Sequence, residues 1–227
     1  MADDVATVGS SGSLWRVGRN PEPLTVAAPK AHDLRGKRAG NRFDIPGVGV
    51  LYCASTLEGC FAETLARFRP KLDLVELVAD EWKAAGHLRP GSVPAGWRHR
   101  RTAVEVAVDP GYRFLDVDHL DTHQVLRGEL ALGLAALGYS DLDAGLIRGP
   151  DRRVTRLVAA WAHQQMADGD GELYRFAGIR YVSRLSTDWV CWAIFPGVEL
   201  AQRQALPVES DMPVLVSVAE RFGLRVF

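Results

Sequence analysis

Residues 47–70 read GVGVLYCASTLEGCFAETLARFRP, and this stretch decides how we expect the chain to fold. Its first part, residues 48–54, is short, apolar and bounded by glycine, which predicts a buried strand. Ser55 or Thr56 can then cap a helix that runs to about Phe68. Apolar side chains recur at helical spacing along this helix and predict a core-facing stripe of Leu57, Phe61, Leu65 and Phe68. The stretch therefore predicts a strand, a tight turn and an amphipathic helix.

The sequence before this unit predicts little regular structure. Residues 1–13 are small and polar without periodicity, which predicts a flexible N-terminal tail. Residues 13–18, SLWRVG, predict a first short strand. The proline-punctuated and then basic residues 20–40 predict a loop, whose charges either lie near a bound phosphate or are simply solvated.

After residue 70, strand-like and helix-like segments follow one another without regular alternation. Residues 71–78 alternate apolar and polar side chains like a half-buried strand, and a linker rich in glycine and proline follows at about 87–97. Further strands are expected at 102–108, 112–117, 178–184 and 189–195, and helices at 119–138 and 150–167, with starts at Asp118 and Asp151 and stops at Gly138 and Gly169. This order favours an α+β fold, and we expect residues 14–227 to form one domain.

Composition excludes several classes of protein. Of 227 residues, 47% are hydrophobic and 24% charged, which is ordinary for a globular chain. A net charge of -1 provides no global field that would attract nucleic acid or an anionic membrane. No apolar run approaches the roughly 20 residues of a membrane span, and the acidic start MADDVATVGSSGS is unlike a secretory signal. We therefore expect a cytoplasmic protein without direct contact to nucleic acid or membrane.

Cysteines and histidines do not form a metal-binding pattern. Cys53, Cys60 and Cys191 are odd in number and lack CxxC spacing, which argues against both a disulfide framework and a zinc site. His119 and His123 are four residues apart, but HLDTH lacks the glutamate of an HExxH site. No metal is expected.

Signatures of nucleotide-binding and hydrolase folds are missing, so polar residues within apolar elements are the remaining candidates. The chain has no GxGxxG after a strand, no GxxxxGK[ST] and no GxSxG. Glu63 lies on the expected helix about 200° from Phe61 and Leu65, and this geometry alone would make it solvent-facing. Tyr52 lies 11 residues earlier on the preceding strand, so phenol and carboxylate can share a cleft, or Tyr52 is a core aromatic residue.

Three more polar residues allow two interpretations each. Arg16 interrupts the apolar strand LWRV and lies either on its exposed face or against an anion. Arg42 lies in a glycine-flanked segment that either folds against a ligand or is a surface loop. Two guanidiniums that converge on one cleft suit a pyrophosphate. Ser183 can bond a phosphate or ribose, or cap its own strand end.

Taken together, these residues resemble the RES-domain family, which is named for its Arg, Glu and Ser. The resemblance spans about Leu14 to Phe195. Four short stretches carry it, namely LWRV, GNRFD, VLYCAS with an acidic helix position 11 residues after the tyrosine, and GIRYVSR. Each is short, but their order and the Tyr-to-Glu spacing make the set moderately specific.

The resemblance implies an ADP-ribosyltransferase-like fold, in which a split β-sheet flanked by helices binds NAD in a cleft. Residue by residue, it implies that Arg16, Arg42, Tyr52 and Ser183 bind NAD, and that Glu63, Tyr52 and Arg42 are catalytic. The implied reaction breaks the nicotinamide–ribose bond, which builds oxocarbenium character on the ribose, as in glycoside hydrolysis. Glu63 would stabilise this charge.

The acceptor decides the name of the implied reaction. Phosphate gives NAD phosphorolysis, water gives hydrolysis, and a protein side chain gives ADP-ribosylation. The family includes toxins whose antitoxins carry an Xre-like helix-turn-helix, so an NAD-depleting toxin with such a partner is the implied role.

The chain departs from the family pattern where many relatives read G-R-W-N. Here residues 41–44 read NRFD: Phe43 keeps an aromatic face, whereas Asp44 adds a negative charge near the expected pyrophosphate. The chain also looks longer than compact toxin members. These departures motivate a second hypothesis, a non-catalytic module that binds a nucleotide or a partner.

Overall fold

The strand and the helix within residues 47–70 form as the sequence predicts. The computed structural model of the chain describes residues 4–10, 12–70, 90–166 and 174–227. Strand β3 (Leu51–Ala54) leads into helix α1 (Leu57–Leu65), and a 3₁₀ turn η2 (Ala66–Phe68) follows. The hydroxyl of Thr56 caps α1 by accepting a hydrogen bond from the Gly59 amide at 3.0 Å.

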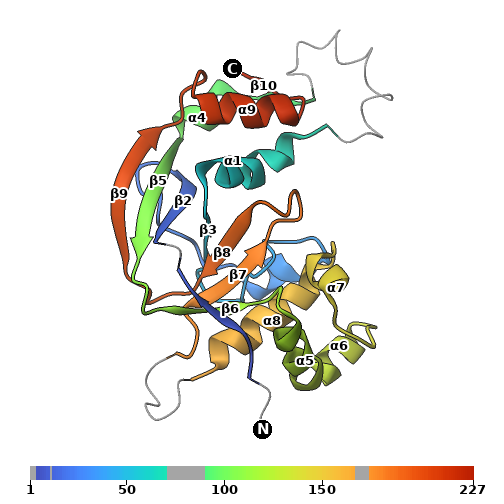
Figure 1. Cartoon of the computed structure of the whole chain (residues 1–227). Coiled ribbons are helices and arrows are strands. Elements are labelled where there is room, and N and C mark those ends of the chain that lie inside the picture. Colours follow the sequence, from blue (N-terminus) through green and yellow to red (C-terminus); the bar gives the residue numbers. More distant parts are fainter. Residues whose placement is uncertain (1–3, 11, 71–89, 167–173) are drawn as a thin grey trace.

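One curled sheet organises the described part of the chain (Figure 1). Besides β3, its strands are β1 (Thr7–Gly9), β2 (Ser13–Arg19), β5 (Arg101–Val108), β6 (Arg113–Asp116), β7 (Gly178–Val182), β8 (Val190–Ile194) and β9 (Leu200–Pro207). The eight strands lie in the order β1–β6–β7–β8–β3–β2–β5–β9. Strands β6 and β7 pair in parallel, and the other neighbours pair antiparallel.

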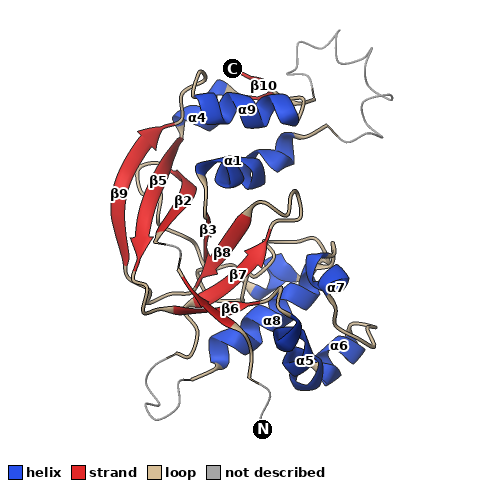
Figure 2. Cartoon of the chain, in the orientation of Figure 1, coloured by secondary structure: helices blue, strands red, loops and turns tan. Residues whose placement is uncertain are grey.

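Helices cover the sheet in two groups. Besides α1, these helices are α4 (Ala95–His99), α5 (Leu120–Glu129), α6 (Ala131–Ala136), α7 (Ala144–Arg148), α8 (Arg152–Gln164) and α9 (Pro213–Arg221). Figure 2 shows α1, α4 and α9 together at one end of the sheet, and α5 to α8 at the other. A short parallel pair, β4 (Ser92–Val93) with β10 (Arg225–Val226), lies beside α9. The mixed α+β class and the helix-flanked sheet agree with the prediction.

Alternation along the strands separates two apolar layers. On β3, the side chains of Leu51 and Cys53 belong to one layer, and those of Tyr52 and Ala54 to the layer that packs on α5 to α8. A third cluster joins α1 to α9 through side chains that include Phe61, Leu65, Leu215 and Val218. Helix α1 is therefore anchored by its apolar stripe, and its opposite face is left for polar residues.

The N-terminal prediction needs one correction. Residues 7–9 lie within the segment expected to be a flexible tail, yet they form β1 and pair antiparallel with β6, with Thr7 opposite Leu115. Val5, just before them, is buried against the core. The segment is too short to show periodicity in the sequence, and its pairing partner lies more than 100 residues away.

Three further expectations are corrected. The described part of the linker expected at 87–97 contains β4 and the start of α4. The helix expected at 119–138 is broken at Leu130 into α5 and α6, and α7 was not predicted. Glycine weakens helices, and Gly133 lies within α6, where a Cβ would lie 2.6 Å from the end of the Leu157 side chain of α8. The strand expected at 71–78 lies outside the described residues.

No described helix is long and apolar enough to cross a membrane.

Candidate active site

A hydrogen bond between Glu63 and Ser183 joins α1 to the end of β7, across 120 residues of sequence. The Ser183 hydroxyl donates to Oε1 of Glu63 at 2.5 Å. Its oxygen accepts a hydrogen bond from the Leu185 amide at 3.0 Å, which directs the hydroxyl proton towards the carboxylate. Ser183 is buried and Glu63 is exposed. Ser183 therefore orients a carboxylate that remains open to solvent, and Oε2 makes no hydrogen bond to another described residue.

Arg42 supplies the positive charge of the site. Its guanidinium lies 5.5 Å from the ring centre of Phe43 and 5.3 Å from that of Tyr181. Nη2 donates to the carbonyl of Ile147 at 2.5 Å, whereas the buried Nε has no hydrogen-bond partner among the described residues. Burial lowers the pKa of Arg42, and the nearby Tyr181 and Glu63 partly oppose this shift. The Arg42 side chain is thus fixed at one end and retains an unused N–H.

Tyr52 and Asp44 build the turn that carries Arg42. The Tyr52 hydroxyl donates to Oδ1 of Asp44 at 2.8 Å and accepts from the Phe43 amide at 3.1 Å. Oδ2 of Asp44 accepts from the Asn41 amide at 2.6 Å. Burial, followed by the charge of Asp44, raises the pKa of Tyr52 well above its usual value. The Tyr52 hydroxyl is therefore committed to the turn, and Asp44, which is 6% exposed, is a structural acceptor and not a free surface charge.

Glycine is required just before this turn. Gly40 has a φ of +61°, and a Cβ there would lie 2.3 Å from the Leu34 side chain and 2.8 Å from Oδ2 of Asp44. Phe43, whose ring was expected to face a ligand, is instead part of the core. It is fully buried, and its ring centre lies 4.7 Å from that of Tyr181.

Arg16 lies elsewhere in the sheet. Its Nε donates to the carbonyl of Pro23 at 2.7 Å and its Nη1 to the carbonyl of Tyr52 at 3.1 Å. Burial lowers its pKa, and the neighbouring Cys53 and Cys60 partly offset this. No hydrogen bond or ion pair among the described residues joins Arg16 to Arg42 or Glu63. The expected convergence of these two arginines on one pyrophosphate stays a prediction.

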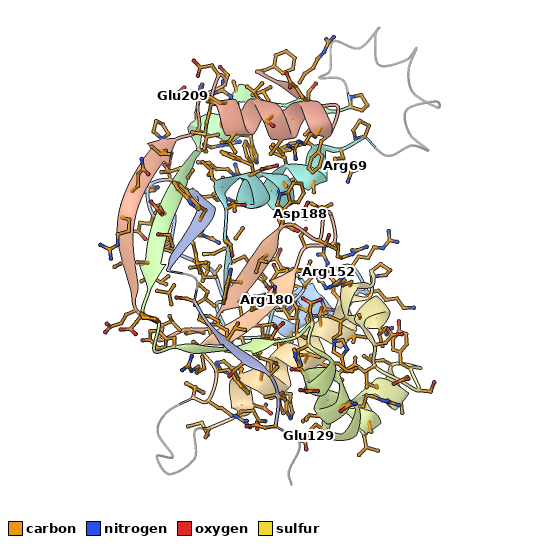
Figure 3. The ribbon with its side chains drawn as sticks, in the orientation of Figure 1. Arg69, Glu129, Arg152, Arg180, Asp188 and Glu209 are labelled. Carbon is orange, nitrogen blue, oxygen red and sulfur yellow. The ribbon has the colours of Figure 1, made fainter. Side chains whose placement is uncertain are left out.

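The side chain of Asp118 fixes the C-terminal end of β7. Asp118 follows β6 and accepts the Val182 amide at 2.6 Å through Oδ2. Its Oδ1 pairs with Arg148 of α7 at 2.8 Å, and Arg180 of β7 bonds Asp116 at 3.1 Å. Figure 3 labels Arg180 on β7 and Arg152 at the start of α8, the strand and helix that flank this network. Asp118, expected to start a helix, instead fixes the backbone that leads to Ser183.

Sequence reasoning missed two residues of the site. Tyr181 lies two residues before Ser183, so strand alternation places both on the same face, and this signal was available in GIRYVSR. Arg184 is exposed and makes no hydrogen bond or ion pair with another described residue. Its charge lies close enough to Arg42 to lower the pKa of that guanidinium. The site therefore combines Glu63, Ser183, Arg42, Tyr181 and Arg184.

The chain is similar to known proteins both in sequence and in structure. The model of the RES domain family matches residues 13–213. A solved structure of the M. tuberculosis MbcT–MbcA toxin–antitoxin complex contains a chain that is similar to this one, with 15% sequence identity, coverage of 95% of this chain and 91% of that chain, and a TM-score of 0.46. No curated protein matches the sequence.

Proposed function

The chain belongs to the RES-domain family, and from this premise we propose that it binds NAD at the site around Glu63 and cleaves the nicotinamide–ribose bond, with phosphate or water as the acceptor. NAD is then a substrate, and its consumption depletes the dinucleotide. Residues 14–227 act as one NAD-binding domain in this proposal.

The Glu63–Ser183 hydrogen bond carries the proposal. A helix whose apolar stripe is buried against α9 would ordinarily turn its polar face to water. Here a buried hydroxyl from a distant strand holds one oxygen of the exposed Glu63, and the other oxygen makes no hydrogen bond to a described residue. Fixing an exposed carboxylate in this way costs side-chain entropy. Such preorganisation is useful where positive charge develops during a reaction.

The chemistry follows from the charges of the site. When the bond between C1′ of the ribose and N1 of nicotinamide breaks, its electron pair goes to N1, which neutralises the pyridinium. Positive charge develops on C1′ and the ring oxygen, and the carboxylate of Glu63 stabilises it. An oxygen of phosphate then bonds this anomeric carbon, which is numbered C1″ in the product, and gives ADP-ribose 1″-phosphate. If water attacks, ADP-ribose and a proton are released instead.

The arginines of the site suit the pyrophosphate of NAD. The guanidinium of Arg42 is held in a fixed position by the Ile147 carbonyl, and the exposed Arg184 lies near it. Two guanidiniums can bind the two phosphates through charge-assisted hydrogen bonds. Their mutual repulsion falls when the dianion binds between them. In this proposal Tyr52 is a positioning residue, because it builds the turn that holds Arg42.

NAD turnover with product masses recorded is the test. Purified wild-type protein should release nicotinamide, faster with phosphate if phosphate is the acceptor. Glu63→Gln should lower kcat by about 100-fold to 1,000-fold, the size expected when one preorganised electrostatic group is lost. Glu58→Gln is the matched control, because Glu58 lies on the same helix and, among the described residues, pairs only with Arg221 at the surface. Intact NAD after incubation of wild type with phosphate, water and candidate acceptor proteins would exclude the proposed reaction.

The family premise also motivates a cellular role. We propose that the chain is the toxin of a toxin–antitoxin pair and that its antitoxin carries an Xre-like helix-turn-helix. Expression of wild type should stop growth and lower cellular NAD, whereas Glu63→Gln should do neither. Growth arrest by the Glu63→Gln variant would separate toxicity from the chemistry of this site.

A further inference from the structure

A second polar region lies just beyond the C-terminal end of α1, around η2. A cavity of about 480 Å³ opens there, lined by Arg19, Arg67, Phe68, Trp97, Arg100 and Arg101. We call it the arginine cavity. None of the residues of the Glu63 site lines it. Its volume lies in the range of small-molecule sites.

The backbone forces like charges together in this cavity. Arg19 ends β2 and Arg101 begins β5, and the two residues are direct cross-strand neighbours. Like charges at such positions destabilise a sheet. Arg100 precedes Arg101 in sequence, and Arg67 extends from η2 to the same cavity. Burial, and then the charges of the other three arginines, lower the pKa of Arg101 to about 10.

No carboxylate among the described residues neutralises these four arginines. Nε of Arg100 donates to the carbonyl of Gly96 at 2.8 Å, and Nη1 of Arg101 to the carbonyl of Trp97 at 3.0 Å. The side chains of Arg19 and Arg67 make no hydrogen bond to another described residue. Most guanidinium N–H groups in the cavity are therefore unused.

Trp97 adds aromatic surface to the same wall. Its side chain is 6% exposed, and its buried Nε1–H has no acceptor among the described residues. A buried donor without a partner is costly. The ring of Phe68 meets the indole edge-on at 5.6 Å, and the guanidinium of Arg101 lies over the indole at 4.4 Å. The walls thus combine donors and aromatic surface, with few acceptors.

We infer that the arginine cavity is a binding site for a small molecule that carries several phosphate groups. Phosphate oxygens accept hydrogen bonds from guanidiniums, often bidentately, and their charge removes the repulsion between Arg19 and Arg101. The site is independent of NAD cleavage. Free polyphosphate and a nucleoside polyphosphate share this chemistry, and only the nucleotide can also use the aromatic wall.

Isothermal titration calorimetry without divalent cations tests this inference. Wild type, Arg67→Gln and Arg203→Gln are titrated with tripolyphosphate, ATP and adenosine. Arg67 is exposed, and its side chain makes no hydrogen bond to another described residue and lies over the Phe68 ring at 5.8 Å, so we expect its replacement to leave the fold intact. Arg203 is a matched exposed arginine on β9, outside the cavity. We expect tripolyphosphate and ATP to bind, and Arg67→Gln to raise both dissociation constants about tenfold. Arg203→Gln should change neither.

Each outcome has a defined meaning. Equal affinity for tripolyphosphate and ATP supports recognition of phosphate alone, and tighter ATP binding adds a role for the aromatic wall. Affinity for adenosine equal to that for ATP would contradict the inference, and so would equal weakening by Arg203→Gln. Binding of a ten-nucleotide single strand without binding of ATP or tripolyphosphate would also overturn it. Because Arg67 lies outside the Glu63 site, Arg67→Gln should leave the KM and kcat for NAD unchanged, which separates the two sites.

Discussion

The Glu63 site and the arginine cavity lie along one helix and its following turn, yet they differ in how their charged side chains are compensated. At the Glu63 site, the carboxylate is held by Ser183 and the guanidinium of Arg42 by a carbonyl and two rings. In the arginine cavity, like charges crowd together, and no described carboxylate compensates them. In the Glu63 site, other parts of the protein hold the charged side chains in place. In the arginine cavity, we infer that a bound anion neutralises them.

This difference predicts opposite consequences of mutation. Removing a polar group from an organised network leaves its partner unsatisfied, which costs stability. Removing one of several crowded like charges relieves repulsion. Three substitutions test the comparison at decreasing expected effect.

The largest effect on stability is expected from Tyr52→Phe. The change leaves the buried Asp44 carboxylate and the Phe43 amide without the phenol. We expect the free energy of unfolding to fall by about 1–3 kcal/mol, measured by urea denaturation. NAD turnover should fall as well, because the turn also holds Arg42.

Tyr112→Phe is the control for this change. The Tyr112 hydroxyl accepts one long hydrogen bond from the Glu199 amide at 3.3 Å in an exposed region, so its loss should cost less than about 1 kcal/mol. Equal destabilisation by the two substitutions would mean that the turn at residues 41–44 does not depend on Tyr52.

A smaller effect, on substrate affinity, is expected from Arg184→Gln. Arg184 is exposed and has no partner among the described residues, so stability should not change. If Arg184 binds a phosphate of NAD, KM should rise about tenfold, equivalent to about 1.4 kcal/mol, and kcat should change little. Steady-state kinetics check this. An unchanged KM would mean that Arg184 does not bind the pyrophosphate of NAD. Arg16 would then remain the candidate for the second arginine beside Arg42.

The sequence predicted the elements of the Glu63 site better than their contacts. The strand and helix of residues 47–70 follow from local patterns, namely an apolar run, a Thr56 cap and a 3.6-residue stripe. Ser183 was placed at a strand end, and only the fold brings it to Glu63. The roles of Asp44 and Tyr52 were not visible, because a hydrogen bond between a strand and a turn leaves no periodic signal.

The arginine cavity was not predictable for a similar reason. Arg19, Arg67 and Arg101 are scattered over more than 80 residues, and each looks like an ordinary surface arginine in its own segment. Their juxtaposition depends on the pairing of β2 with β5 and on the placement of η2 beside α4. The segment containing Trp97 also reads as a linker, although it contains α4. Register and packing, which determine these contacts, are not encoded in local composition.

The smallest effect distinguishes the two regions most directly. Arg19→Gln removes one of two opposed guanidiniums and breaks no hydrogen bond to another described residue. Without ligand, we expect the free energy of unfolding to stay constant or rise by about 0.5 kcal/mol, and the gain should shrink at high salt because screening already weakens the repulsion. With saturating tripolyphosphate, wild type should have the higher free energy of unfolding, because the anion binds wild type more tightly and therefore stabilises it more. Urea denaturation with and without tripolyphosphate measures this reversal. A loss of more than about 1 kcal/mol without ligand would show that Arg19 is held by the protein, as Arg42 is.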